Sequence, residues 1–74
     1  MSDVPYNMTD SLGKRIRKMR RYLDMSQEEL ADKIDSSRSH ISTLEHDGVE
    51  PKLETISKLA KAFKLSLDEF LKGL

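Results

Sequence analysis

Apolar residues recur at helical spacing along most of the chain, and the first such run lies between residues 12 and 23. Its members follow one another at steps of four, three and four residues: Leu12, Ile16, Met19 and Leu23. This spacing places them on one face of a helix, with charged residues on the other faces. Residues 1–10 contain Pro5 and no apolar period, which predicts a flexible tail. The tail has no Lys or Arg, so it is not expected to act as a minor-groove arm.

Two short helices are predicted next, with a tight polar turn between them. Ser26 and Glu29 have the spacing of a capping box, in which each side chain accepts a hydrogen bond from the other residue's backbone amide. The second short helix begins at Ser37 and runs through Glu45. The residues expected to face inward are apolar and helically spaced: Leu30, Ala31, Ile34, Ile41 and Leu44. Helices of about eight residues are unstable alone in water, so these two must be held by packing against each other.

Two further helices complete the predicted architecture. Pro51 is placed to open the first of them. Its apolar positions keep helical spacing: Leu53, Ile56, Leu59, Ala60 and Phe63. Ser66 and Glu69 form a second capping-box pair and start a last short helix, which contains Leu67, Phe70 and Leu71. Because no strand pattern, internal repeat or low-complexity tract occurs, residues 11–74 are expected to form an all-α, five-helix bundle.

Length and composition limit the classes of protein to consider. Seventy-four residues make one domain, near the lower end of what can build its own hydrophobic core. The chain has no Cys and only two His, so neither a disulfide framework nor a structural zinc site is expected. The start has no signal-peptide pattern, and no apolar run approaches the roughly 18 residues of a membrane span. The sequence therefore predicts a soluble, cytoplasmic protein with no cofactor and no metal.

The charge is balanced overall but polarised along the chain. Lys and Arg together number 13 and so do Asp and Glu, which gives zero formal net charge and disfavours strong, sequence-independent binding to phosphate. The segment 12–23 has six cations and no acid: Lys14, Arg15, Arg17, Lys18, Arg20 and Arg21. Acids gather at 28–35 and 45–50. Apart from Arg20, the cations of the first helix form either a solvated face or a phosphate-binding face, and the sequence leaves both interpretations open.

A recognisable motif occupies the centre of the chain. It reads SQEELADKIDSSRSHISTLE, framed by LGKRIRKMRR before it and PKLETISKLAKAFKLSLDEF after it. With these flanks it strongly resembles the helix-turn-helix DNA-binding domain of the phage repressor and Cro family, over Leu12 to about Leu71. Several independent features coincide, among them the Ser-Gln-Glu-Glu-Leu-Ala opening of the second helix and the Ser-Leu-Asp-Glu-Phe opening of the last. The resemblance implies a compact, five-helix, lambda-repressor-like fold.

The same resemblance implies which residues touch DNA. In the family, the second helix of the motif lies in the major groove, with its first turn against the base edges. By position, base contacts fall to Arg38, Ser39 and Thr43, and Arg38 can donate a bidentate pair to guanine O6 and N7. Contacts with the DNA backbone fall to four more positions: Ser26, Gln27, His46 and Lys52. Taken alone, each of these residues could equally be a helix cap, a helix end or an ordinary surface residue.

Other positions bear on the geometry and strength of binding. Arg20 and Glu45 match a pair that in the family joins the first helix to the end of the recognition helix. Asp24 and Asp35 stand where glycine is common, and aspartate tolerates the left-handed conformation there at a cost of about 1 kcal/mol. The loop 46–50 carries acids where relatives often carry cations, which predicts modest affinity for DNA and a shallow salt dependence.

Two functions from different classes are consistent with these features. The first is a sequence-specific, double-stranded-DNA-binding transcriptional regulator, a repressor, that binds an operator as a homodimer. Phe70, Leu71 and Leu74 are the candidate dimer contacts, unless they close the core instead. The alternative is a protein-interaction module that keeps the fold without binding DNA, which the zero net charge permits. An enzyme is the poorest hypothesis, because no nucleophile with a base and no phosphate-cradling loop can be assembled. The sequence identifies neither an operator nor a toxin or antagonist partner.

Overall fold

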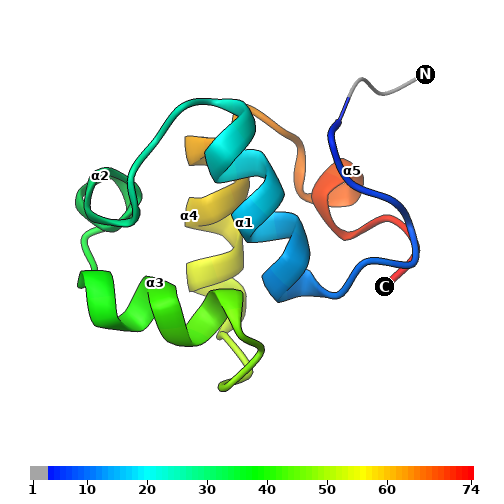
Figure 1. Ribbon diagram of the computed structural model, residues 1–74. Coiled ribbons are helices and arrows are strands. Elements are labelled where there is room, and N and C mark those ends of the chain that lie inside the picture. Colours follow the sequence, from blue (N-terminus) through cyan, green and yellow to red (C-terminus); the bar gives the residue numbers. More distant parts are fainter. Residues whose placement is uncertain (1–3) are drawn as a thin grey trace.

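The computed structural model describes residues 4–74, and in them the chain forms five helices (Figure 1). In chain order they are α1 (Leu12–Tyr22), α2 (Gln27–Lys33), α3 (Arg38–Glu45), α4 (Leu53–Ala62) and α5 (Leu67–Leu71). No strand occurs in this described range. The predicted all-α, five-helix fold is therefore confirmed. The largest shift concerns α4, which begins at Leu53 rather than at Pro51.

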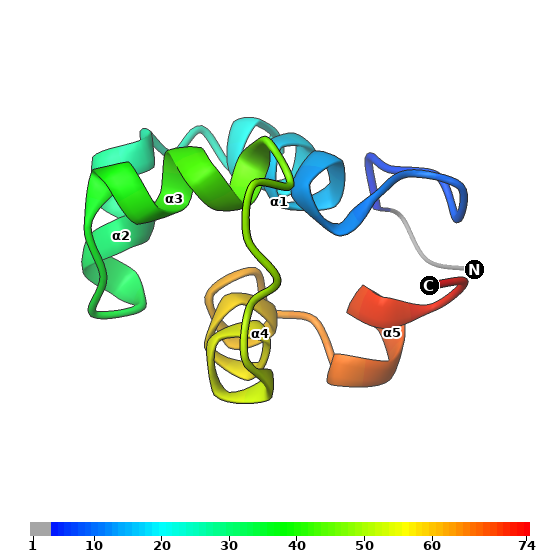
Figure 2. The ribbon, with the colours of Figure 1, turned by 90° about the horizontal axis from the view of Figure 1, so that it is seen from below.

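The helices are arranged in two layers. Helix α3 packs against both α2 and α1, while α4 packs against α5. Figure 2 shows α1, α2 and α3 on one side of the molecule and α4 with α5 on the other. In Figure 1, α2 is seen almost end-on while α3 lies across the view, so these two helices cross at a steep angle. The arrangement leaves one long side of α3 exposed to solvent.

The hydrophobic core lies between these layers and draws on all five helices. Its buried members are Tyr6, Ile16, Met19, Leu30, Ala31, Ile34, Ile41, Leu44, Leu59, Ala60, Phe63 and Phe70. Phe63 and Phe70 meet edge to face, with ring centroids 5.7 Å apart, which is a favoured aromatic geometry. Leu53 keeps the helical spacing of the α4 core residues but lies outside the core, since its side chain is 64% exposed. Helix α4 reaches the core only from Ile56 onward, one turn after its start.

The C-terminal residues divide between core and surface. Phe70 is fully buried against Phe63, so its predicted role as a dimer contact is wrong. Leu71 is partly buried and packs on the same core, whereas Leu74 is 60% exposed. Phe70 is therefore a full member of the hydrophobic core, and Leu71 contributes to it in part.

The N-terminal segment is part of the folded domain over the residues that the structure describes. Tyr6 is buried, and its hydroxyl donates a hydrogen bond to the Glu69 carbonyl oxygen in α5 at 3.2 Å. Asp10 bonds the Lys18 ammonium at 2.7 Å. Residues 4–10, which the sequence predicts to be a flexible tail, thus make contacts with α1 and α5, and the remainder of the predicted tail, residues 1–3, lies outside the described residues.

Arg15 explains why this segment is ordered. Its side chain is fully buried, whereas the sequence assigned it to a face exposed to solvent or phosphate. The guanidinium donates to three backbone carbonyl oxygens, those of Met8 at 2.8 Å, Asp10 at 3.1 Å and Phe70 at 2.9 Å. It also lies 4.9 Å from the centre of the Tyr6 ring, within cation–π distance. One arginine of α1 thus ties the N-terminal segment to α5.

Four helices end in the same backbone motif without glycine at its left-handed position. The residues with positive φ are Asp24, Asp35, Asp47 and Lys64, with φ between 54° and 60°. After each, the next amide donates back to the carbonyl five residues earlier, as Met25 does to Arg20 at 2.9 Å. This pattern is the Schellman motif, which usually employs glycine. The prediction that Asp24 and Asp35 adopt the left-handed conformation is confirmed.

Candidate nucleic-acid interface

Side-chain caps fix both ends of the turn between α2 and α3. The Ser26 hydroxyl accepts from the Glu29 amide at 3.0 Å, and the Glu29 carboxylate accepts from the Ser26 amide at 2.9 Å, which confirms the predicted capping box. The bond from the Ser26 amide holds the pKa of the Glu29 carboxyl below its usual value. Ser37 caps α3 by accepting from the His40 amide at 3.1 Å. Helix α3 therefore starts at a defined residue, Arg38.

The far end of α3 is held by a buried ion pair. Glu45 is 2% exposed and receives two hydrogen bonds from the Arg20 guanidinium, from Nε at 2.6 Å and from a terminal nitrogen at 3.1 Å. The third Arg20 nitrogen donates to the Met25 carbonyl oxygen at 2.9 Å. The predicted pairing of α1 with the end of α3 is thus present in bidentate form. Bidentate pairs of this kind fix orientation as well as adding energy.

Two further side chains reach Glu45, and sequence reasoning missed both links. The Gln27 amide nitrogen donates to a Glu45 carboxylate oxygen at 3.3 Å. Arg17 donates to the Glu45 carbonyl oxygen at 3.3 Å, and its Nε lies 3.9 Å from the carboxylate. Gln27 precedes Glu45 by 18 positions in the sequence, and Arg17 precedes it by 28. These side chains meet Glu45 only because of the way in which α1, α2 and α3 cross. No local pattern could have revealed these contacts.

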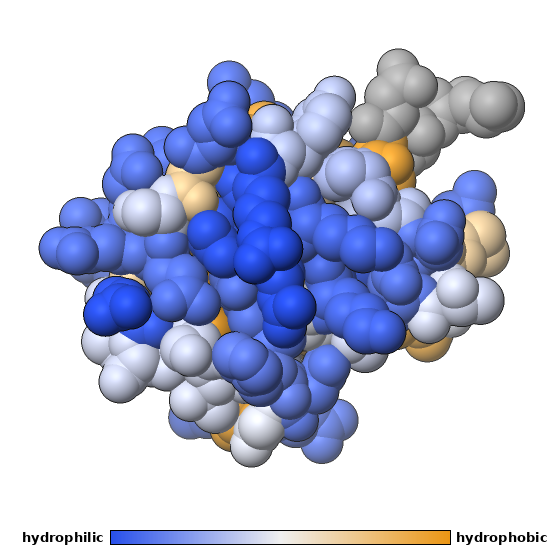
Figure 3. Space-filling model, in the orientation of Figure 1, coloured by the Kyte–Doolittle hydropathy of each residue, from blue (hydrophilic) through white to orange (hydrophobic). Residues whose placement is uncertain are grey.

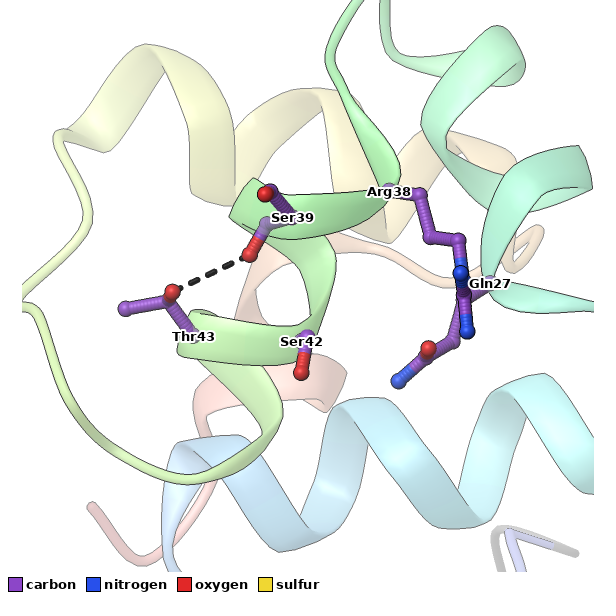
Figure 4. A pocket seen from close by; sticks show the side chains of 5 residues that line it. All are labelled: Gln27, Arg38, Ser39, Ser42 and Thr43. Atoms are coloured by element: carbon purple, nitrogen blue, oxygen red, sulfur yellow. Dashed lines mark hydrogen bonds between the residues drawn. The ribbon is translucent and has the colours of Figure 1, made fainter.

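An open depression lies where the first turn of α2 meets the exposed side of α3 (Figure 4). It is lined by Gln27, Arg38, Ser39, Ser42 and Thr43. All three residues predicted to contact bases are therefore together on one surface, with one of the predicted backbone-contacting residues beside them. Ser42 was missed, although its place one turn after Arg38 on the same helix could have indicated it.

A second depression continues the first toward α1. It shares Gln27 and Arg38 with the first and adds Arg20, Arg21, Ser26 and Glu28. Among residues 4–74, no carboxylate lies within 4.0 Å of Arg21 or Arg38, so both cations are available to an anionic partner. In Figure 3 the most hydrophilic atoms of this face gather over α1. The two depressions thus form one polar surface with unpaired positive charge.

The other predicted backbone-contacting residues lie outside the first depression. Ser26 borders the second one, with its hydroxyl oxygen already accepting from Glu29. His46 follows the last residue of α3, and its Nδ1 lies 2.7 Å from the Ser42 carbonyl oxygen. Lys52 precedes α4 and is exposed. His46 therefore lies at the end of α3 away from Arg38, whereas Lys52 lies at the start of α4.

The loop after α3 uses one of its acids internally. The Asp47 carboxylate accepts from the Gly13 amide at 2.9 Å and from the Ser11 hydroxyl at 2.6 Å, so it stabilises the first turn of α1. A Cβ at Gly13 would come within 2.6 Å of the Leu44 carbonyl oxygen, which makes glycine necessary for this close approach. The loop charge that the sequence set against DNA binding is thus partly neutralised by a helix N-terminus.

No group of three or more His, Cys, Asp or Glu side chains among residues 4–74 is arranged to hold a metal ion. None of the helices described here has the length and apolar character needed to cross a bilayer.

The fold and the polar surface on α3 define a class of protein. A family model described as helix-turn-helix matches residues 16–70, and the chain belongs to that family. The predicted likeness to phage repressors is confirmed by the structure of the P22 c2 repressor in complex with synthetic operator 9T. That structure matches with a TM-score of 0.79 and 36% identity, over 89% of this chain and 100% of the other. The complex of SinR, the master regulator for biofilm formation, with DNA has a TM-score of 0.76 and 25% identity, over 84% and 100%.

Two transcriptional regulators are similar in sequence. The HTH-type transcriptional regulator PuuR of Escherichia coli (strain K12) is 41% identical over 58 residues, which cover 78% of this chain and 31% of PuuR. The HTH-type transcriptional regulator ImmR of Bacillus subtilis (strain 168) is 33% identical over 61 residues, which cover 82% of this chain and 48% of ImmR. The chain therefore spans less than half the length of either relative.

Proposed function

We propose that this chain is a sequence-specific, double-stranded-DNA-binding transcriptional regulator, a repressor, that reads the major groove with α3. The observation that carries the proposal is the convergence of Arg38, Ser39 and Thr43 on one exposed surface. Because the buried contact between Arg20 and Glu45 fixes the far end of α3, that surface is presented rigidly. The regulators similar in sequence and the two similar structures solved with DNA support the assignment. Such a protein acts in the cytoplasm and is not an enzyme.

The side chains have distinct roles in this proposal. Arg38 donates two hydrogen bonds to guanine O6 and N7, while Ser39 and Thr43 make smaller contacts with neighbouring bases. Four residues around the surface contact the DNA backbone: Ser26, Gln27, His46 and Lys52. Backbone contacts set the position of α3 in the groove, and base contacts carry the sequence preference. Gln27 connects the two roles, since it touches both Glu45 and the depression that contains Arg38.

The operator is bound by a homodimer, with one α3 in each of two half-sites. Twofold symmetry in the protein matches a palindromic operator with half-sites about 34–36 Å apart. Leu74, which is exposed, and Leu71, which is partly buried, are the C-terminal residues available for the contact between protomers. Sedimentation of the protein with a two-site duplex tests this part. One protomer bound per duplex at saturation would contradict it.

The proposal as a whole is tested by selecting bound duplexes from a random pool. The affinity of the protein for the selected duplex is then measured by titration. Arg38→Ala is expected to weaken binding by about 1 to 3 kcal/mol and to abolish the preference for guanine at one position. Lys61→Ala removes an exposed cation of α4, away from α3, and serves as the matched control for charge alone. Unchanged binding by the double variant Arg38→Ala, Thr43→Ala would overturn the assignment of α3. Failure to select any duplex at low ionic strength would instead favour a protein-interaction module, which the zero net charge permits.

A further inference from the structure

Thr43 has a hydroxyl group that is already committed within α3. Its Oγ1 donates to the Ser39 carbonyl oxygen at 3.0 Å, which is the usual bond of a helical threonine to the preceding turn (Figure 4). A hydroxyl has a single proton to donate. Thr43 therefore offers a partner no donor, only oxygen lone pairs and its methyl group. Figure 4 shows Oγ1 turned back toward Ser39 and the methyl carbon pointing away from the helix.

The methyl group is supported from behind by the backbone of the following loop. The Gly48 amide donates to the Thr43 carbonyl oxygen at 2.9 Å, which brings the loop close to this turn of α3. A Cβ added at Gly48 would lie 3.1 Å from the Thr43 methyl carbon, tighter than ordinary contact. Glycine at this position leaves room for the methyl group, and the bond to Ser39 fixes the other branch of the side chain. The methyl group is thus held in one orientation on the exposed surface.

We propose that Thr43 recognises the 5-methyl group of a thymine in each operator half-site through methyl–methyl contact. This inference rests on the proposed function, and it names the chemical group that one position of α3 recognises. In the major groove thymine alone among the four bases presents a methyl group. Arg38 lies five residues earlier on the same surface, about 7.5 Å along the helix axis or roughly two base-pair steps. Each half-site therefore pairs a guanine recognised by Arg38 with a nearby thymine recognised by Thr43.

The test removes the methyl group from the DNA and from the protein in turn. The probe is a duplex selected from a random pool by the wild-type protein. Each thymine in its half-sites is replaced by deoxyuridine, which lacks only the methyl group. At one symmetry-related position the replacement is expected to weaken binding about fourfold per half-site, the value of burying one such carbon. The other thymine positions are expected to change little.

Two variants of similar size separate the methyl group from the hydroxyl. Thr43→Ser keeps the hydroxyl and removes the methyl group, so it should bind the thymine and deoxyuridine duplexes equally. Thr43→Val keeps the methyl group and removes the hydroxyl, so it should retain the preference for thymine. Lys61→Ala, which changes an exposed cation of α4 away from this surface, is the control that should leave the ratio unchanged.

Each outcome bears on one claim. If the wild-type protein selects a sequence but binds it equally well with every thymine replaced, this inference falls while the proposed function stands. If Thr43→Ser keeps the preference for thymine over deoxyuridine, another side chain contacts the thymine methyl group, and the role given to the Thr43 methyl group is overturned. If no sequence is selected at all, the proposed function itself fails.

Discussion

Arg15 and Arg20 both belong to α1, but they stabilise two different regions of the molecule by different means. Arg20 reaches a buried carboxylate, that of Glu45, with two hydrogen bonds at 2.6 and 3.1 Å. Arg15 reaches three backbone carbonyl oxygens and the Tyr6 ring, and within residues 4–74 no carboxylate lies within 4.0 Å of it. The first contact neutralises a charge at the end of the recognition helix. In the second contact the guanidinium has no carboxylate partner and donates instead to carbonyl oxygens near the two ends of the described chain, those of Met8, Asp10 and Phe70.

The two arginines therefore have different expected roles: Arg20 fixes the position of α3 for DNA binding, and Arg15 stabilises the folded domain. The Arg20 contact joins α1 to the end of α3, so its loss is expected to affect DNA binding as well as stability. The Arg15 contact joins the N-terminal segment to α5 on the other side of α1, and its loss is expected to affect stability alone. Variants of the two regions therefore give different results in binding and in unfolding experiments.

The largest effect is expected from Glu45→Ala. The substitution leaves Arg20 without its carboxylate and removes the acceptor of Gln27, and breaking a buried pair in this way costs about 3 to 5 kcal/mol. A small domain has a total stability of about 5 to 15 kcal/mol, so much of the protein is expected to unfold in moderate urea and to lose DNA affinity. Glu50→Ala, an exposed acid nearby, is the control. A loss below 1 kcal/mol in urea unfolding would contradict the role given to the pair.

Arg15→Met is expected to cost about 2 to 3 kcal/mol, because it leaves the Phe70 carbonyl oxygen buried without its donor. Amide hydrogen exchange should accelerate at Tyr6 and its neighbours, where the segment is no longer tied down. At temperatures where the variant stays folded, its affinity for the selected duplex should match that of the wild-type protein. A specific loss of affinity in the folded variant would show that the two regions are coupled.

The residues with positive φ at the helix ends allow the cost of backbone strain to be separated from the contribution of the side chain. Lys64→Gly is expected to stabilise the protein by about 0.5 to 1 kcal/mol, since glycine adopts φ near 60° without a Cβ penalty. Asp47→Gly occupies the same backbone geometry but loses the bonds to Gly13 and Ser11, so it should destabilise instead. Thermal unfolding of the two variants gives shifts of opposite sign if this account is right.

The smallest effect concerns acid pH, and each region contributes one carboxyl group to it. The Lys18 ammonium holds the pKa of Asp10 below its usual value, and the Ser26 amide does the same for Glu29. A carboxyl with a lowered folded-state pKa stabilises the fold above its unfolded pKa, near 4, and this contribution is lost as the pH falls through the folded value. Urea unfolding between pH 5 and pH 3 should show the decline. Asp10→Asn and Glu29→Gln should each make it shallower.

The sequence predicted those parts of the fold and site that depend on local patterns. Helix spacing, the capping box at Ser26 and the left-handed Asp24 and Asp35 are properties of short segments, and the structure confirms them. The burial of Arg15 carried no such signal, because its acceptors are carbonyl groups that every residue possesses. The packing of residues 4–10 onto α1 and α5 depends on that side chain together with the contacts of Tyr6 and Asp10.

The candidate site shows the same division. The motif on α2 and α3 predicted Arg38, Ser39 and Thr43, and the structure brings these three together. Neither the bond from Gln27 to Glu45 nor the contact of Asp47 with α1 could be predicted, since each depends on the angle at which two helices cross. No local pattern indicates that one of the loop acids, Asp47, accepts hydrogen bonds from Ser11 and Gly13 at the start of α1.

Chemical-shift mapping by solution NMR tests the central claim most directly. On addition of the selected duplex, the account predicts that the backbone amides of Gln27, Arg38, Ser39 and Thr43 shift most, and that the amide of Tyr6 does not move. Shifts centred on residues 4–10 and α5, with α3 unaffected, would show that DNA meets a different surface and would contradict the account.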